Sequence, residues 1–451
     1  MMRLAICTFA LTVGVWCLLS ISGGCPAGRP AISACGKSEA DDSGDVLTVF
    51  ITGNELGALK PCGCSGGQLG GLDRRAEVLN SVSGSKRLIV DTGEFVEGDG
   101  EQDLIKFNIV IQAFGLLGYD LVSLSERDVE IAKSLDLLEG IGSVFDVIGF
   151  QGEVEAGLPT KFTKRLSLGG IETAVTVGAF DAETQPIERL GELFTHGCEG
   201  QTVNILILKL CDDAIIDSIA KTGLVDFLVC PAESDEPGII GEASARPLVI
   251  SAGRLGKYVG RLQIAAGGEK KLTYSFSSVP VTEELAQEES LVELYKTYQQ
   301  LVKEDNLLEK QPRFVLPNGL EYTGSKSCKL CHEYEYERWS GKAHAKAYAT
   351  LEKVGSQYDP ECVVCHVVGM RYVSGFVSED ETGHLKNVGC ENCHGPGSEH
   401  NMTLGKALTT QPMSDCGDCH TPEHSAEYEG NEELYLSKIV HWREPNAVGD
   451  V

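Results

Sequence analysis

Short apolar runs rich in β-branched residues recur through the first part of the chain, and each has the length of one buried strand. They lie at residues 46–51, 88–90, 147–150, 173–177, 203–208, 227–230 and 248–252. Stretches compatible with a helix lie between several of them, as at residues 104–117 and 214–220. Strands that alternate with helices predict an α/β domain, which we place at residues 45–281.

The pattern changes after residue 281. One apolar stripe runs among charged neighbours and comprises Leu291, Leu294, Tyr295, Tyr298, Leu301 and Val302. This spacing predicts an amphipathic helix within residues 282–306. We assign residues 282–320 to a linker helix and connector, and residues 321–451 to a second domain.

The N-terminus has a basic residue, an apolar run over residues 4–21 and small residues up to Cys25. This layout predicts an export signal, although about 18 apolar residues are also enough for a membrane anchor. The small residues before Cys25 are typical of a lipoprotein signal, but Ser22 stands where an aliphatic residue is usual. We expect residues 1–25 to direct export and residues 26–44 to form a tether. The mature protein is then periplasmic or anchored on the extracytoplasmic side, with a lipidated Cys25 as the route to membrane attachment.

The charge balance narrows the choice of partners. The 451 residues include 66 Asp and Glu against 38 Lys and Arg, which gives a net charge of −28. Such a chain repels polyanions, so we expect no nucleic-acid partner and favour proteins with a basic docking face. The hydrophobic content of 42% excludes a mainly disordered chain.

Cysteine and histidine concentrate in the second domain, where the sequence Cys-x-x-Cys-His occurs four times. The motifs are Cys328/Cys331/His332, Cys362/Cys365/His366, Cys390/Cys393/His394 and Cys416/Cys419/His420. This spacing attaches haem c, because the two thiols bond the vinyl groups while the next imidazole ligates the iron. Two zinc tetrathiolate sites are the alternative, but zinc does not need a histidine directly after each second cysteine. We expect four covalently attached haem c groups.

Other side chains are candidates for the opposite axial position. They are His344, His384, His400, His424 and His441, with Met370, Met402 and Met413 as softer ligands. His344 lies 12 residues after His332, which is about 18 Å along a helix. We therefore expect it to ligate a neighbouring haem, and we take His344 and His400 as the main distal candidates.

Residues 327–332, 339–345 and 388–400 resemble the tetrahaem cytochromes of nitrifying bacteria. They also resemble the wider multihaem family that contains hydroxylamine and nitrite oxidoreductases. The resemblance implies a mainly helical, haem-packed domain that passes electrons, with His344 and His400 as distal ligands. Some members of that family keep one haem five-coordinate, so an oxidoreductase of a small nitrogen or sulfur compound is an alternative function.

The first domain resembles the periplasmic 5′-nucleotidases of the calcineurin-like metallophosphatase fold. The matching motifs lie in order at residues 70–76, 88–94, 118–122 and 252–260. The resemblance implies a β-sandwich flanked by helices. The family's metal-binding histidines fall on residues 54–56, 125–128, near 210 and 230–233, where no histidine stands. Because His196 is the only histidine in the domain, we expect the phosphoesterase chemistry to be lost; a surviving metal-dependent phosphoesterase is the second alternative.

A Cys62-Gly63-Cys64 loop precedes the first of these motifs. It resembles a loop of 5′-nucleotidase-like (seleno)proteins, in which selenocysteine can replace a cysteine, and this implies redox use of Cys62 and Cys64. The alternatives are a structural pair bonded to Cys198, Cys211 or Cys230, and ligation of metal or haem. The pairing of those three cysteines and of Cys35 stays open. We predict an exported electron-transfer cytochrome with a non-hydrolytic 5′-nucleotidase-like domain.

Overall fold

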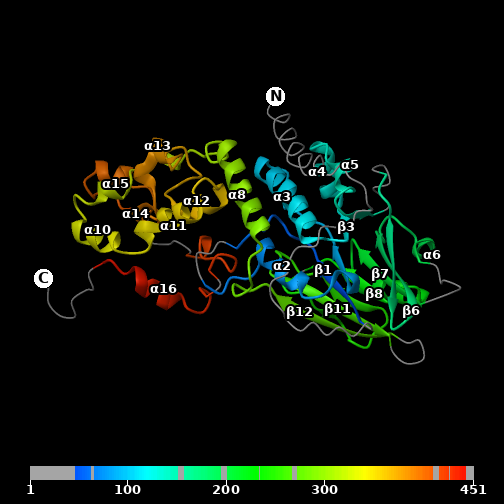
Figure 1. The fold of residues 1–451 in the computed structure, drawn as a ribbon. Helices are drawn as coiled ribbons and strands as arrows, with labels where there is room; N and C mark the ends of the chain where they lie inside the picture. Colours follow the sequence, from blue (N-terminus) through cyan, green and yellow to red (C-terminus); the bar gives the residue numbers. More distant parts are fainter. Residues whose placement is uncertain are drawn as a thin grey trace. The chain divides into compact units, whose positions relative to one another are not determined.

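The computed structural model describes residues 46–61, 66–150, 157–194, 201–232, 234–266, 272–409, 416–425 and 427–442. The chain divides into two compact units (Figure 1): Lys60–Leu69 and Val292–Val451 form the second, and the rest of the chain forms the first. Several predictions fall on residues outside the described ranges: the export signal with Cys25, the tether with Cys35, and Cys62, Cys64, His196, Cys198 and Met413. Within the described ranges, no helix combines the length and apolar character that a membrane span requires.

Two six-stranded mixed sheets form the framework of the first unit, with the orders β12-β11-β1-β2-β3-β4 and β5-β6-β7-β8-β10-β9. The first contains β1 (Val46–Thr52), β2 (Arg87–Asp91), β3 (Leu121–Leu124), β4 (Asp146–Gly149), β11 (Tyr258–Ala266) and β12 (Leu272–Pro280). The second contains β5 (Lys161–Leu168), β6 (Ile171–Phe180), β7 (Gln201–Leu208), β8 (Phe227–Cys230), β9 (Ile239–Ile240) and β10 (Leu248–Ser251). Strands β1 to β4 are parallel, as are β6, β7, β8 and β10, while the remaining strands add antiparallel edges.

The core of this unit lies between the two sheets. Alternate residues such as Val49 of β1 and Ile205 of β7 belong to this core and are buried. On the other face of the second sheet, Leu206 and Leu228 pack against Leu190 of α6 and Ile219 of α7. The helices of this unit are α2 (Leu72–Asn80), α3 (Glu101–Leu117), α4 (Glu126–Ser134), α5 (Leu138–Ile141), α6 (Leu190–Leu193) and α7 (Asp213–Thr222). The predicted α/β sandwich flanked by helices is confirmed.

All seven predicted strands and both predicted helices of this unit are present. The strands that were not predicted lie mainly at the antiparallel edges, where one face is half exposed. Strand β5, for example, alternates exposed and partly buried residues along Lys161–Leu168. Such strands lack the continuous apolar run that marks a parallel strand buried on both faces.

The second unit is mainly helical, as predicted, and its helices are short. After α8 (Glu289–Glu304) come α9 (Ser325–Cys328), α10 (Glu333–Ser340), α11 (Ala347–Val354), α12 (Pro360–His366), α13 (Glu379–Thr382), α14 (Cys390–His394), α15 (Ser398–Met402) and α16 (Glu432–Ile439). The predicted stripe on α8 is confirmed, since Leu291, Tyr298 and Val302 are buried. A small apolar cluster built around Val363 and Phe376 forms the protein core of this unit.

Candidate functional site

Each Cys-x-x-Cys-His motif lies in or beside a short helical turn. Cys328 ends α9, whereas α12 and α14 contain the second and third motifs. The backbone N–H of His332 donates to the carbonyl of Cys328 at 2.9 Å, and His420 donates to Cys416 at 2.8 Å. In a helical turn, residues i, i+3 and i+4 lie on one face. Both thiols and the imidazole of a motif therefore project to the same side.

The motifs also lie next to one another. Cys328 of the first motif lies close to Cys390 of the third. Cys365 of the second motif lies close to Cys419 of the fourth. Cys393 of the third motif lies near enough to Cys419 for their charges to interact. These proximities favour the order first, third, fourth, second for the attachment sites.

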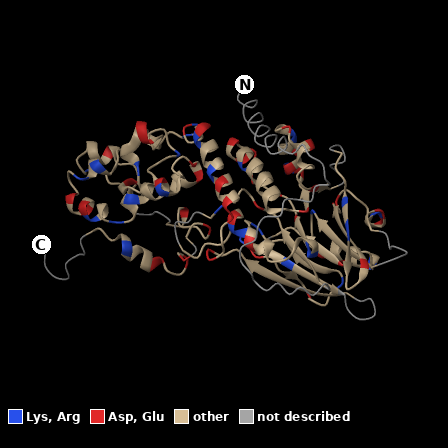
Figure 2. Cartoon of the chain, viewed as in Figure 1, with Lys and Arg blue, Asp and Glu red and all other residues tan. Residues whose placement is uncertain are grey.

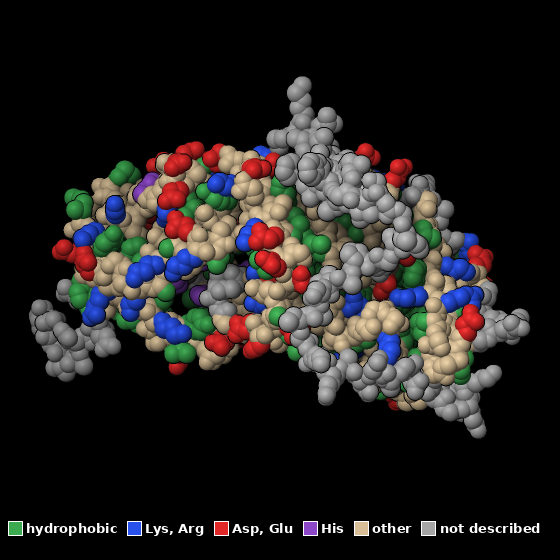
Figure 3. Space-filling model, viewed as in Figure 1, with side chains coloured by type: hydrophobic (Ala, Val, Ile, Leu, Met, Phe, Trp, Pro, Cys, Tyr) green, Lys and Arg blue, Asp and Glu red, His purple; other side chains and the backbone are tan. Residues whose placement is uncertain are grey.

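Three motif histidines face a second imidazole from a distant part of the chain. The ring centroids are 5.9 Å apart for His332 and His400, 6.3 Å for His344 and His420, and 6.3 Å for His394 and His441. An imidazole nitrogen lies about 2 Å from a metal that it binds, and the ring centroid about 1 Å farther, so two imidazoles on opposite sides of one ion have centroids about 6 Å apart. These three separations therefore fit bis-histidine ligation of a haem iron. In the face shown in Figure 3, histidine side chains of the second unit lie at a hollow.

The fourth motif histidine, His366, has a different environment. Its Nδ1 lies 2.7 Å from the carbonyl oxygen of Ala347. His424 lies close enough to lower the pKa of His366, although burial is the main cause of that shift. Burial also lowers the pKa of His344, His394 and His420. A lowered pKa keeps the imidazole neutral, which is the form that binds a metal.

Sequence reasoning did not single out His441, because no motif surrounds it and its ring reaches His394 only through tertiary structure. The other candidates occupy different environments. Met370 is buried in the apolar core of the second unit, and Met402 is 78% exposed. His384 packs beside Gly324.

A buried carboxylate holds the first and third motifs in place. Glu391, within the third motif, accepts hydrogen bonds from the backbone N–H groups of Thr323 at 2.9 and 3.1 Å, Gly324 at 2.7 Å and Gly397 at 2.7 Å. It is 4% exposed. These bonds tie α14 to the segment before Cys328 and to the start of α15, the helix that contains His400. Glu391 thereby fixes the first and third motifs relative to one distal imidazole.

In the first unit, the loops that follow β1 to β3 meet at the position of the altered metal-binding motifs. Arg75 of α2 donates from Nη2 to both carboxylate oxygens of Glu55, at 2.8 and 2.7 Å, and neither side chain is exposed. Burial raises the pKa of Glu55, and the charge of Arg75 opposes that rise. Arg75 Nη1 also donates to the hydroxyl of Tyr119 at 3.1 Å. The charge of Glu55, on the loop after β1, is thus balanced by Arg75.

Two other carboxylates nearby, Asp91 and Asp128, accept hydrogen bonds from neighbouring strands and loops. Asp91 accepts from the hydroxyl of Thr52 at 2.6 Å and from Gly93 N–H at 2.8 Å. Asp128 accepts from the backbone N–H of Glu94 at 2.8 Å, Phe95 at 3.0 Å and Ser125 at 3.0 Å. Burial raises the pKa of both Asp91 and Asp128. The carboxylate oxygens of Asp91 and Asp128 therefore hold the surrounding loops in place.

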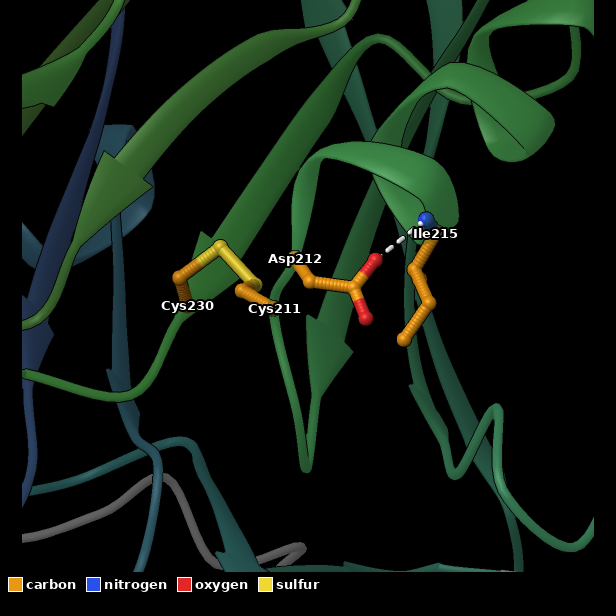
Figure 4. Close-up of a disulfide and its surroundings, with 4 residues drawn as sticks. All are labelled: Cys211, Asp212, Ile215 and Cys230. Atoms are coloured by element: carbon orange, nitrogen blue, oxygen red, sulfur yellow. Dashed lines mark hydrogen bonds between the residues drawn. A yellow bond between two sulfur atoms is a disulfide. The ribbon is translucent and has the colours of Figure 1, made fainter.

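A cavity of about 570 Å³ opens beside these loops and is lined by Glu94, Arg127, Lys209 and Cys230 among others. Cys211, just after β7, forms a disulfide with Cys230 at the end of β8 (Figure 4). Next to it, Asp212 caps α7 by accepting from Ile215 N–H at 2.7 Å. The interpretation that Cys62 or Cys64 bonds to Cys211 or Cys230 is therefore wrong. In the described part of the chain, no three or more His, Cys, Asp or Glu side chains are arranged to hold a metal ion.

The C-terminal region and the chain's overall fold are similar to different known proteins. Residues 327–395 match the family described as Cytochrome c554 and c-prime, and this segment includes the first three Cys-x-x-Cys-His motifs. Cytochrome c-554 from Nitrosomonas europaea is 36% identical over 91 residues, which cover 17% of this chain and 39% of that protein. The chain thus spans well under half the length of this relative. Its C-terminal region is similar to c-type cytochromes of this family.

Solved 5′-nucleotidases are similar to the chain in fold. A 5′-nucleotidase precursor from Thermus thermophilus is 16% identical with a TM-score of 0.43, covering 59% of this chain and 60% of that one. The 5′-nucleotidase from Candida albicans is 12% identical with a TM-score of 0.41, covering 57% and 58%.

Proposed function

We propose that the protein is an exported tetrahaem c-type cytochrome that transfers electrons. The observation that supports this most directly is the set of three imidazole pairs with centroids about 6 Å apart. Each pair joins the histidine of one attachment motif to a histidine elsewhere in the sequence. Haem c bound at the motifs supplies a one-electron Fe(III)/Fe(II) couple.

The axial ligands follow from these pairs. His332 with His400, His394 with His441, and His420 with His344 ligate the haems of the first, third and fourth motifs. For the second motif, we propose His366 as the proximal ligand and His424, whose charge helps to lower the pKa of His366, as the distal ligand. In this proposal the distal ligand of the fourth motif comes from the segment just after the first motif, so His344 serves a haem other than the one that His332 ligates.

The proximity of cysteines from different motifs supports an order of electron transfer. The first, third, fourth and second attachment sites follow one another through Cys328–Cys390, Cys393–Cys419 and Cys419–Cys365. The first and second motifs, at the ends of this series, are where we place electron entry and exit. Redox partners with a basic docking face fit the net charge of −28. Figure 2 shows that Asp and Glu residues occur along the helices of both units.

Export and location belong to the same proposal. An export signal at residues 1–25 directs the chain to the periplasmic side, where haem is attached, and a lipidated Cys25 retains it at the membrane. Labelling with a lipid precursor and mass determination of the mature N-terminus test this part. A mature chain that starts beyond Cys25 and has no lipid would exclude the anchor but not the electron-transfer function.

We also propose that the first unit no longer hydrolyses phosphate esters. Arg75 neutralises Glu55 on the first loop, and Asp128 is occupied by backbone N–H groups. Both features leave few oxygens free to hold a pair of catalytic metal ions.

Cys62 and Cys64 form a redox pair connected to the haems in this proposal. The residues that flank them support it, since Lys60–Leu69 groups with the second unit. Gln68 of that segment is 5% exposed and donates to the backbone carbonyls of Glu423 and His424, each at 3.3 Å. A Cys62→Ser/Cys64→Ser variant should slow haem reduction by a thiol donor while its haem spectrum stays unchanged. Equal rates, or a disulfide from either cysteine to Cys198, would assign the pair a structural role.

Visible and EPR spectra of the oxidised protein test the electron-transfer function. A pyridine haemochrome assay should return about four haems per chain, following the four attachment motifs. His344→Ala should convert one low-spin haem to high-spin, whereas His384→Ala, at a histidine that faces no motif imidazole, should convert none. A colourless protein loaded with zinc would refute the proposal. A high-spin signal in the parent protein would instead favour an enzyme with an open haem at His366.

A further inference from the structure

His420 is surrounded by polar and aromatic side chains. Its Nδ1 lies 2.8 Å from the hydroxyl oxygen of Ser425. Tyr428 stacks on its ring with centroids 5.1 Å apart, and Tyr435 meets the ring edge-on at 5.4 Å. The ring centroid of His344 lies 6.3 Å from that of His420. The orientation of this imidazole is therefore fixed from several directions.

The hydrogen-bond acceptor of His420 differs from those of other ligand histidines. The Nδ1 atoms of His366, His400 and His441 lie 2.7, 2.7 and 3.0 Å from backbone carbonyl oxygens. His420 faces the hydroxyl of Ser425, which is 9% exposed. When Nε2 binds iron, Nδ1 keeps its proton and donates it to this partner. The acceptor is then the side chain of Ser425, which a substitution can change. A backbone carbonyl cannot be changed in this way.

Ser425 lies on a turn that is held at both ends. Its backbone N–H donates to Thr421 at 2.8 Å, and its own carbonyl accepts from Tyr428 N–H at 2.8 Å. Gln68 donates to the carbonyls of the two preceding residues, Glu423 and His424. Gln68 thereby positions the turn from a part of the chain 355 residues away.

We propose that Ser425, on a turn positioned by Gln68, sets the reduction potential of the haem attached at Cys416 and Cys419. This inference rests on the proposed ligation of that haem by His420. A stronger acceptor at Nδ1 makes the imidazole more basic, stabilises Fe(III) and lowers the potential. A neutral hydroxyl is a weaker acceptor than a carbonyl or a carboxylate, so Ser425 holds this haem at a higher potential than a carbonyl would.

The test is an EPR-monitored redox titration of the full haem-loaded chain. Ser425→Asp places a carboxylate near Nδ1 and should lower one of the four midpoint potentials. Ser425→Ala removes the acceptor and should raise the same potential, and Ser425→Thr, which keeps the hydroxyl, should restore the parent value. Gln68→Ala should shift this potential in the same direction as Ser425→Ala, because the turn loosens. Ser437→Ala is the matched control, since the Ser437 hydroxyl bonds to the Leu434 carbonyl on α16.

The affected haem is identified with His344→Ala, which removes the low-spin signal of the haem ligated by His420. If Ser425→Ala and Ser425→Asp shift the potential in the same direction, or if no potential moves, the role of Ser425 is refuted. The role of Ser425 is also refuted if the midpoint potential that shifts belongs to a haem other than the one whose low-spin signal is lost in His344→Ala. If His344→Ala leaves all four signals unchanged, the ligand assignment in the proposed function is what fails.

Discussion

Arg75 and Glu55 form a bidentate ion pair inside the first unit, and neither side chain is exposed to solvent. Glu55 follows β1, at residues 54–56, where the resemblance to 5′-nucleotidases predicts a metal-binding motif but no histidine stands. The guanidinium of Arg75 thus balances the charge of the carboxylate at this position.

Loss of one member of this pair should destabilise the first unit strongly. Arg75→Met leaves the charge of Glu55 buried without its partner, which costs about 3–5 kcal/mol. The double variant Arg75→Met/Glu55→Gln should lose less, because no unpaired charge remains. Chemical denaturation followed by circular dichroism measures both.

The matched control is Arg165→Met. Arg165 and Glu172 form an ion pair in which both side chains are at least 70% exposed, and such pairs contribute about 0–1 kcal/mol. Equal losses for Arg75→Met and Arg165→Met would show that the buried pair is not a stabilising unit.

The stability of the first unit should fall as the pH rises towards neutrality. Burial raises the pKa of Asp91 from its ordinary value of 3.8 to about 7, against hydrogen bonds from Thr52 and Gly93. The folded state therefore favours protonated Asp91, and this contribution is present at pH 3.8 and lost as the pH passes about 7. When the denaturation midpoint is measured at a series of pH values, its decrease with rising pH should be smaller for Asp91→Asn than for the parent protein. Asp217→Asn, at an exposed position, should keep the slope of the parent.

Phosphate esters should not be substrates. Adenosine monophosphate and an aryl phosphate should remain intact with added manganese or zinc, because Glu55 and Asp128 are already bonded within the protein. Phosphate release is the measurement. Hydrolysis that copurifies with the protein and disappears in Asp91→Asn or Glu94→Gln would show that a metal site persists.

Glu391 should be needed for the arrangement of the first and third motifs. Glu391→Ala leaves the N–H groups of Thr323, Gly324 and Gly397 without their acceptor, and each such loss costs about 1–3 kcal/mol. We expect lower stability and a disturbed low-spin signal from the haem ligated by His400. Glu399→Ala, at an exposed glutamate on the next helix, is the control. An unchanged spectrum and midpoint in Glu391→Ala would contradict this role.

The sequence alone predicted elements whose signals are local. Continuous apolar runs located every parallel strand except β3, and the spacing of Cys328, Cys331 and His332 indicated an attachment site. The pairing of His394 with His441 could not be predicted, because it depends on how separate short helices pack. The Cys211–Cys230 disulfide could have been inferred, since both cysteines stand at the carboxyl ends of neighbouring parallel strands. Nothing near Glu55 indicated that Arg75 would neutralise it.

The grouping of Lys60–Leu69 with the second unit has a consequence for biosynthesis. During synthesis, Gln68 emerges long before the residues that it contacts, so it has no acceptors at Glu423 and His424 until nearly the whole chain has been made. Gln68 therefore reaches its final environment only after the C-terminal region has folded. In a chain truncated after residue 291, Gln68 would lack both acceptors, and we expect proteases to cut the chain beside it more readily.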